Sequence, residues 1–235
     1  MKSRLFKWTW KIIDLVYPPQ CAGCGENGIR WCDDCQKSLV LVERNTCSKC
    51  GEPLKTEGRE ICLRCATGVT YFQQLKSYAV YQDPLKSAIQ QFKYKRNLGL
   101  GEIFAGDLMD ILKKSNWQID LIVPVPLSIA RIRERGYNQA LVLARPLGWK
   151  MEIPVQENLL VRHRDTKPQV GLSLAEREQN LQDAFRTKDS GCIAGKNILI
   201  VDDVITSGST MNACAKAFHE AGAGAVYGVS LARAI

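Results

Sequence analysis

The chain has 235 residues, of which 46% are hydrophobic and 24% charged, and 32 Lys and Arg face 24 Asp and Glu. This composition excludes disordered and collagen-like classes, and no apolar run approaches the ~20 residues that a membrane helix needs. The net charge of +8 favours an acidic partner such as nucleic acid or phosphate, and most of the surplus lies in residues 76–147, which carry 11 basic and 6 acidic side chains.

The first 19 residues predict a short amphipathic helix, because Leu5, Trp8, Ile12 and Leu15 recur at helical spacing before a Pro-Pro pair. Charges interrupt the apolar residues and no small-residue cleavage site follows, so we do not expect a signal peptide. We expect the helix to dock on the protein body, with a membrane-surface anchor as the alternative. A cytoplasmic location follows, where clustered cysteines usually bind metal.

Eight cysteines between positions 21 and 65 form four CxxC pairs. Two thiolates from one such turn can take adjacent corners of a zinc tetrahedron, so four pairs make two sites. Residues 21–35 and 47–65 repeat one pattern, C-x2-C-G-E, a variable tip and C-x2-C, which predicts that each repeat closes its own site; interleaved pairs are the alternative. The expected ligands are Cys21, Cys24, Cys32 and Cys35 for one zinc, and Cys47, Cys50, Cys62 and Cys65 for the other.

Protein ligands fill all four positions of each site, so we expect both zinc ions to be structural. The segment resembles a double zinc ribbon, a module that commonly docks nucleic acid or protein. A stapled domain without a binding role is the alternative reading.

Beyond residue 70, strands and helices alternate. We expect strands at 76–81, 119–126, 197–201 and 225–231, and helices beginning after Asp83-Pro84 and covering 103–113, 138–144 and 209–221, with a capping box at Ser173–Glu176 starting another. Such alternation predicts an α/β fold with a parallel sheet and helices on both faces. The expected domains are therefore residues 1–70, with the N-terminal helix and ribbons, and residues 71–235.

One segment, residues 198–210, carries the most chemical information. An apolar strand delivers Asp202 and Asp203 to its carboxyl end, and a loop of hydroxyls and glycine then enters a helix. Loop amides and the helix terminus suit a phosphate, while two carboxylates suit ribose hydroxyls or a bound magnesium. The loop residues are Thr206, Ser207, Gly208, Ser209 and Thr210.

This stretch resembles the phosphoribosyl pyrophosphate (PRPP) signature of type I phosphoribosyltransferases. The resemblance implies that Asp202 and Asp203 bind the ribose hydroxyls and that residues 206–210 bind the 5-phosphate of PRPP or ribose 5-phosphate, with Mg²⁺ accompanying PRPP. Purine-salvage relatives carry an acid where this chain has Thr206, and that acid serves there as the base. The catalytic residues therefore stay unassigned, and an acceptor that needs no strong base fits best.

The whole chain resembles the ComF family, competence-associated proteins that join a zinc ribbon to a phosphoribosyltransferase-like domain. The resemblance rests on the four CxxC pairs, Phe92-Lys93-Tyr94-Lys95, Pro124-Val-Pro126, residues 135–140 and Arg162 with Thr166 and Gln169. It implies a pyrophosphate loop after the strand at 119–126 and a hood near residues 162–180. Arg131, Arg133 and Arg135 are then candidates for the diphosphate, because guanidinium groups match phosphate oxygens.

A basic stretch with interleaved aromatics precedes this region. Lys93, Lys95 and Arg96 lie beside Tyr94 and Phe92, a composition suited to single-stranded DNA, although we expect Phe92 to face the core. A solvated helix face is the alternative for the three basic residues.

Three functions follow as hypotheses. The first is a ComF-like protein that binds PRPP or a related phosphoribosyl group and assists uptake or processing of single-stranded DNA in natural transformation, with a DNA helicase or another competence protein as partner. The second is a phosphoribosyltransferase acting on a base or amine. The third is a zinc-stapled adaptor with a vestigial pocket.

Overall fold

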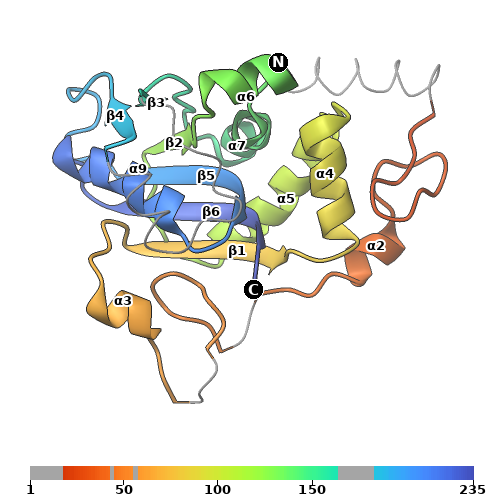
Figure 1. Ribbon diagram of the computed structural model, residues 1–235, viewed down its shortest axis with the longest axis horizontal. Coiled ribbons are helices and arrows are strands. Elements are labelled where there is room, and N and C mark those ends of the chain that lie inside the picture. Colours follow the sequence, from red (N-terminus) through yellow and green to blue (C-terminus); the bar gives the residue numbers. More distant parts are fainter. Residues whose placement is uncertain (1–17, 43–44, 55–57, 164–182) are drawn as a thin grey trace.

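The computed structural model describes residues 18–42, 45–54, 58–163 and 183–235. At its centre is a four-stranded sheet in the order β1-β6-β5-β2, in which each neighbouring pair is parallel. The strands are β1 (Gln74–Val80), β2 (Leu121–Pro124), β5 (Ile198–Ile205) and β6 (Val226–Arg233). The predicted α/β fold with a parallel sheet is confirmed (Figure 1).

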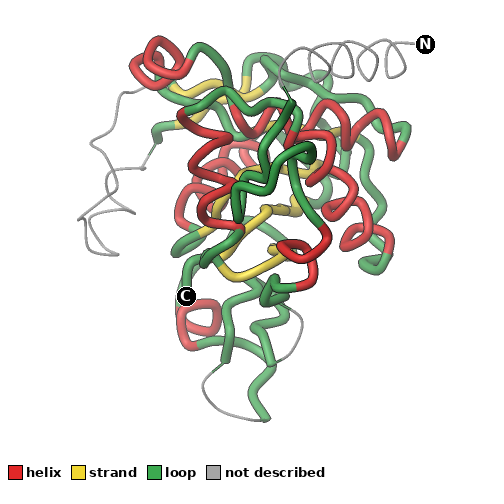
Figure 2. Tube along the Cα trace, turned by 90° about the vertical axis from the view of Figure 1, so that its right-hand side faces the viewer, coloured by secondary structure: helices red, strands yellow, loops and turns green. Residues whose placement is uncertain are grey.

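Helices cover both faces of this sheet. On β5, Leu199 and Val201 belong to a buried cluster with residues of three helices, whereas Ile198 and Ile200 belong to a second cluster with residues of α9. Successive strand residues point to opposite faces, so α9 packs opposite the other three helices. Figure 2 shows the strands, in yellow, between the helices, in red. The three helices of the first face are α4 (Leu85–Tyr94), α5 (Leu100–Lys113) and α7 (Gln139–Met151), and α9 spans Ser209–Glu220.

Two helical features differ from the expectation. Helix α6 (Ile129–Arg135) stands where only a loop was expected, between its N-cap Ser128 and a left-handed Gly136 at its end. Helix α7 was expected to end near residue 144, but it continues through Pro146 to Met151. Leu147, beyond that proline, is fully buried in the core, so packing extends the helix past a residue that usually ends one.

An antiparallel pair, β3 (Leu160–Arg162) and β4 (Phe185–Thr187), lies beside α9 and was not predicted. Each strand has three residues, which is too short for an alternating pattern to be recognised in the sequence.

The two cysteine repeats pack against opposite faces of the sheet. Cysteines of the first repeat, which contains α2 (Asp33–Lys37), belong to the buried cluster of α4, α5 and α7. Those of the second repeat, which contains α3 (Leu63–Thr67), belong to the cluster of α9. Figure 1 accordingly shows α2 near the start of α4 and α3 at the other end of β1.

Three sequence expectations concern residues outside the described part of the chain: the amphipathic helix, apart from its terminal prolines, the capping box at Ser173–Glu176, and the hood beyond residue 163 with Thr166 and Gln169. Among the helices of the described ranges, none combines the length and hydropathy needed to cross a membrane.

Helix α4 provides a test of the core. Phe92 is fully buried, as expected, whereas Tyr94 on the same helix is 63% exposed. Phe92→Ala leaves a cavity and is expected to lower the free energy of unfolding by ~3–5 kcal/mol, and Tyr94→Ala by less than ~1 kcal/mol. Denaturant unfolding of both variants measures the difference; equal losses would contradict this packing.

Candidate functional site

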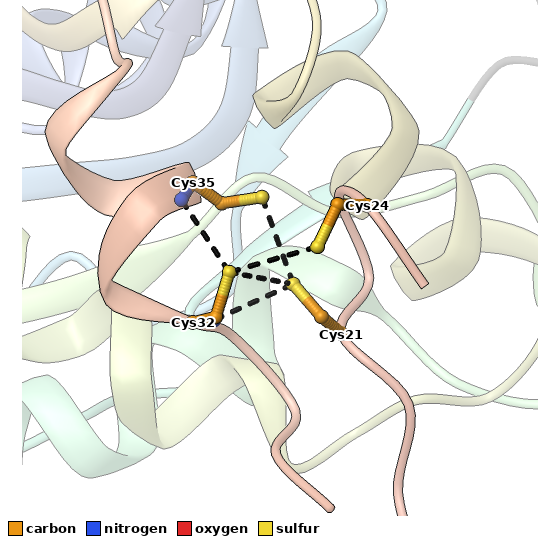
Figure 3. Close-up of side chains that lie close together, drawn as sticks. All are labelled: Cys21, Cys24, Cys32 and Cys35. Atoms are coloured by element: carbon orange, nitrogen blue, oxygen red, sulfur yellow. Dashed lines mark hydrogen bonds between the residues drawn. The ribbon is translucent and has the colours of Figure 1, made fainter. Parts of the chain in front are cut away.

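The first cysteine repeat brings the sulfurs of Cys21, Cys24, Cys32 and Cys35 together in one cluster (Figure 3). The sulfur of Cys21 lies 3.6 Å from that of Cys32 and 3.7 Å from that of Cys35, and the sulfurs of Cys24 and Cys32 are 3.6 Å apart. Four sulfurs bound to zinc at about 2.3 Å lie about 3.8 Å from one another in a tetrahedron. The spacing of the sulfurs therefore fits zinc.

The second repeat forms a matching site from Cys47, Cys50, Cys62 and Cys65, whose sulfurs all lie within 4.8 Å of one another. Each site takes its ligands from one repeat, which is the sequential pairing and not the interleaved one. All four zinc positions are filled by protein in both sites, which supports the predicted structural role.

Backbone amides favour the thiolate form of one cysteine in each site, Cys21 and Cys47. The amide of Cys32 donates to the Cys21 sulfur at 3.4 Å, and that of Cys62 to the Cys47 sulfur at 3.3 Å. Burial by itself raises the pKa of Cys21, but the amides outweigh it and lower the pKa to about 6. The same balance lowers the pKa of Cys47 to about 7.

Polar contacts attach the second ribbon to the body of the protein. Arg233, which ends β6 and is only 1% exposed, donates to the Cys50 carbonyl at 2.7 Å. Asn212 of α9 accepts from the Tyr71 amide at 2.8 Å and donates to the Val69 carbonyl at 3.0 Å. The ribbon therefore contacts the end of β6 and the first turn of α9.

The first ribbon is tied to the other face. Gln36 of α2 donates to the Tyr78 hydroxyl at 2.6 Å and to the Asp107 carboxylate at 3.0 Å. Burial raises the pKa of Asp107 to about 6, above its ordinary value. Gln91 of α4 donates to the Ala22 carbonyl at 3.2 Å, which fixes this ribbon against α4.

A cavity of about 580 Å³ lies where β5 and β2 end, and charged side chains from several elements meet in it. Parallel strands end at a common edge, so segments far apart in the sequence converge there. The lining includes Lys93 of α4, Arg131 and Arg135 of α6, Asp202 and Asp203 of β5 and Thr210 of α9.

An ion pair organises the acidic side of this cavity. The Lys93 ammonium lies 2.8 Å from a carboxylate oxygen of Asp203, and these side chains are 19% and 11% exposed. Burial by itself raises the pKa of Asp203, but the Lys93 charge outweighs it, so the pKa lies below its ordinary value. Burial and then the Asp203 charge raise the pKa of Asp202. Asp203, beside the ammonium, is thus the more readily ionised member of the pair.

The loop after β5 divides its residues between two hollows. Gly208 takes a φ of +81° immediately before α9, a conformation that glycine adopts without strain. Thr210 lines the cavity with the two carboxylates, whereas Ser207, Gly208 and Ser209 line a separate hollow of about 620 Å³ against the second ribbon. The hydroxyls of Ser207 and Ser209 lie 2.8 Å apart.

The three arginines of α6 also differ in whether they line the cavity. Arg131 and Arg135 line the cavity, and Arg135 is 8% exposed, with its guanidinium 5.2 Å from the ring centre of Tyr94. Arg133 is exposed and is not part of the lining. Arg162, one of the residues that resemble the ComF family pattern, also lines the cavity.

The three basic residues near the end of α4 that are candidates for binding DNA also differ in where their side chains lie. Lys93 points into the cavity, whereas Lys95 and Arg96 are exposed beside Tyr94. The contact between Lys93 and Asp203 was missed from the sequence, because 110 positions separate the two residues and no local pattern relates them.

The zinc sites are expected to hold two ions per chain, and paired variants test their ligand sets. Cys21→Ser with Cys35→Ser removes ligands from one site in the sequential arrangement, so elemental analysis should give one zinc. Interleaved sites would both be damaged and lose both ions. Cys192→Ser, at an exposed thiol outside both sites, is the control and should keep two.

Two family models match this chain. Residues 12–66 match a double zinc ribbon domain, and residues 98–233 match a phosphoribosyl transferase domain.

Named relatives are similar over most of the chain. "Competence protein F" of Haemophilus influenzae is 33% identical, covering 89% of this chain and 92% of its own. "DNA utilization protein YhgH" of Escherichia coli K12 is 31% identical, covering 90% and 96%. A solved adenine phosphoribosyltransferase is 19% identical over 58% of this chain and 71% of its own, with a TM-score of 0.36, which adds nothing to the assignment. The family models and the relatives together show that this chain belongs to the ComF family, in which a double zinc ribbon precedes a phosphoribosyltransferase domain.

Proposed function

We propose that the cavity binds the phosphoribosyl group of PRPP or ribose 5-phosphate. The observation that carries the proposal is the meeting of an acidic pair, Asp202 and Asp203, with Thr210 at the start of α9 and with two arginines of α6 in one cavity. Carboxylates accept hydrogen bonds from sugar hydroxyls, and a loop that enters a helix offers amides to a phosphate. Residues 206–210 are the proposed phosphate ligands; Thr210 lines the cavity itself, whereas Ser207, Gly208 and Ser209 line the separate hollow.

Arg131 and Arg135 are the proposed diphosphate ligands, since guanidinium groups bind phosphate oxygens in pairs. Arg133 is less suited, because its side chain is exposed outside the cavity. Mg²⁺ enters as the counter-ion of the diphosphate. At Asp202 and Asp203, the Lys93 ammonium already supplies a positive charge. A Mg²⁺ ion therefore fits this acidic pair less well than it fits the diphosphate.

The second part of the proposal is a role in the uptake or processing of single-stranded DNA in natural transformation. Relatives that match over most of the chain are named for competence and DNA utilization. Tyr94, Lys95 and Arg96 form an exposed aromatic and basic surface near the cavity, suited to base stacking and phosphate contacts. We place this activity in the cytoplasm, where thiolates stay reduced, with a helicase or another competence protein as partner.

Transfer of phosphoribose to a base or amine is the second candidate function, favoured by the presence of acidic, cationic and loop groups in one cavity. Thr206 supplies no base, so the acceptor would have to be a nucleophile without a strong requirement for proton removal. Release of pyrophosphate from PRPP, Mg²⁺ and candidate acceptors tests this activity.

The sugar site predicts a selective loss of binding. Replacing Asp202 and Asp203 with Asn removes anionic acceptors but keeps the loop amides, so affinity for ribose 5-phosphate should fall at least ~10-fold while inorganic phosphate still binds. Calorimetry measures both ligands, and Asp110→Asn, at an exposed carboxylate of α5, should change neither. If the wild type binds no PRPP with Mg²⁺ at millimolar concentration, the pocket is vestigial and the adaptor hypothesis replaces this one.

The DNA surface predicts a change in salt dependence. Lys95→Ala with Arg96→Ala should reduce the slope of log affinity against log salt by ~0.7 for each phosphate of the single strand that the variant no longer binds. Lys113→Ala with Lys114→Ala, an exposed pair at the end of α5, is the matched control. Fluorescence anisotropy over a salt series measures both. An equal effect of the two pairs would place the DNA-binding surface elsewhere.

A further inference from the structure

Lys93 is a cavity residue that the phosphoribosyl transferase domain match does not include. That match begins at residue 98, whereas Lys93 comes from α4, which follows β1. Its ammonium nevertheless lies 2.8 Å from a carboxylate oxygen of Asp203, in the cavity that Asp202 also lines. The residue is therefore an addition to the cavity from the segment between the ribbons and the matched domain.

The position of Lys93 is fixed by its neighbours in α4. The preceding residue, Phe92, is fully buried, and its carbonyl accepts a hydrogen bond from the Tyr137 hydroxyl. Close by on the same helix, Gln91 binds the first zinc ribbon through Ala22. These contacts fix the helix, and the ion pair with Asp203 holds the ammonium before a ligand enters, so little side-chain entropy remains to be lost on binding.

Asp203 is buried and the adjacent Asp202 is half-buried, and a nearby positive charge favours ionisation of such a pair, because each ionised group disfavours ionisation of the other. Asp202 responds with a raised pKa, whereas Asp203 stays ionised beside Lys93. A divalent cation could meet the same need through oxygen ligands. Here the ammonium occupies that place, and an ammonium has three donors, so one contact to Asp203 leaves donors for a sugar oxygen.

We propose that the Lys93 ammonium takes the place of a divalent cation at the acidic pair. It keeps Asp203 ionised, so that this carboxylate accepts a hydrogen bond from a sugar hydroxyl. A sugar monophosphate therefore binds without metal. Lys93 is in this sense a specificity-determining residue for the sugar. The inference rests on the proposed function, since it requires that the cavity binds a phosphoribosyl group.

Calorimetry with ribose 5-phosphate, in EDTA or in millimolar Mg²⁺, tests the proposal. The wild type should bind equally in both conditions. Lys93→Met leaves Asp203 buried without its partner, so affinity in EDTA should fall at least ~10-fold, and Mg²⁺ should restore part of it by entering the vacated place. Lys93→Arg keeps the charge and should retain metal-independent binding. Lys86→Met, at an exposed lysine near the start of the same helix, should behave as wild type.

Recovery by Mg²⁺ separates a cation's role from a merely structural one, because a misfolded cavity would not be repaired by the metal. Three results overturn the inference: a wild type that needs Mg²⁺ for ribose 5-phosphate, a Lys93→Met variant that binds as wild type in EDTA, or a weakened variant without recovery in Mg²⁺. If the wild type binds ribose 5-phosphate in neither condition, the proposed function itself fails.

Discussion

Parallel pairing of the four strands is the constraint on which the candidate site depends. Because β1, β2 and β5 run in one direction, the segments that follow them begin at one edge of the sheet. The α4 segment then supplies Lys93, the α6 segment supplies Arg131 and Arg135, and the loop after β5 supplies Thr210. Each segment contributes only part of the cavity wall. The cavity therefore depends on the topology of the sheet, because that topology brings charged residues from distant segments together at one edge.

The same sheet explains why two small zinc units are attached where they are. A parallel sheet needs cover on both faces, and the ribbons extend that cover in opposite directions, the first against α4 and α5 and the second against α9. Each repeat is too short to fold around a core of its own, so metal ligation holds it together. Their attachment points, Gln91 on one side and Asn212 and Arg233 on the other, belong to elements that line the cavity or adjoin its loop.

Structural features that depend on contiguous residues could be predicted from the sequence, whereas those that depend on tertiary contacts could not. The CxxC repeats predicted both zinc ligand sets, because each pattern lies within a few turns of chain. The apolar run at 197–201 predicted the first part of β5, but the strand continues through both acids to Ile205, where pairing with β6 extends it. Helix α6 and the β3–β4 pair have no clear periodicity and form through their neighbours. The inward direction of Arg135 and the outward direction of Arg133 likewise depend on where α6 packs, which spacing alone does not reveal.

The end of α4 separates two kinds of positive charge within a short stretch of chain. Positions two apart on a helix differ by about 200°, so Lys93 and Lys95 face opposite ways when Phe92 anchors the helix in the core. Lys93 is neutralised by Asp203, while Lys95 and, in a left-handed conformation, Arg96 remain exposed. The basic residues that are contiguous in the sequence therefore belong to two separate places in the structure, the cavity and the exposed surface. In the proposed functions the inward charge serves a sugar phosphate and the outward charges serve DNA, so a shift of α4 would affect both together.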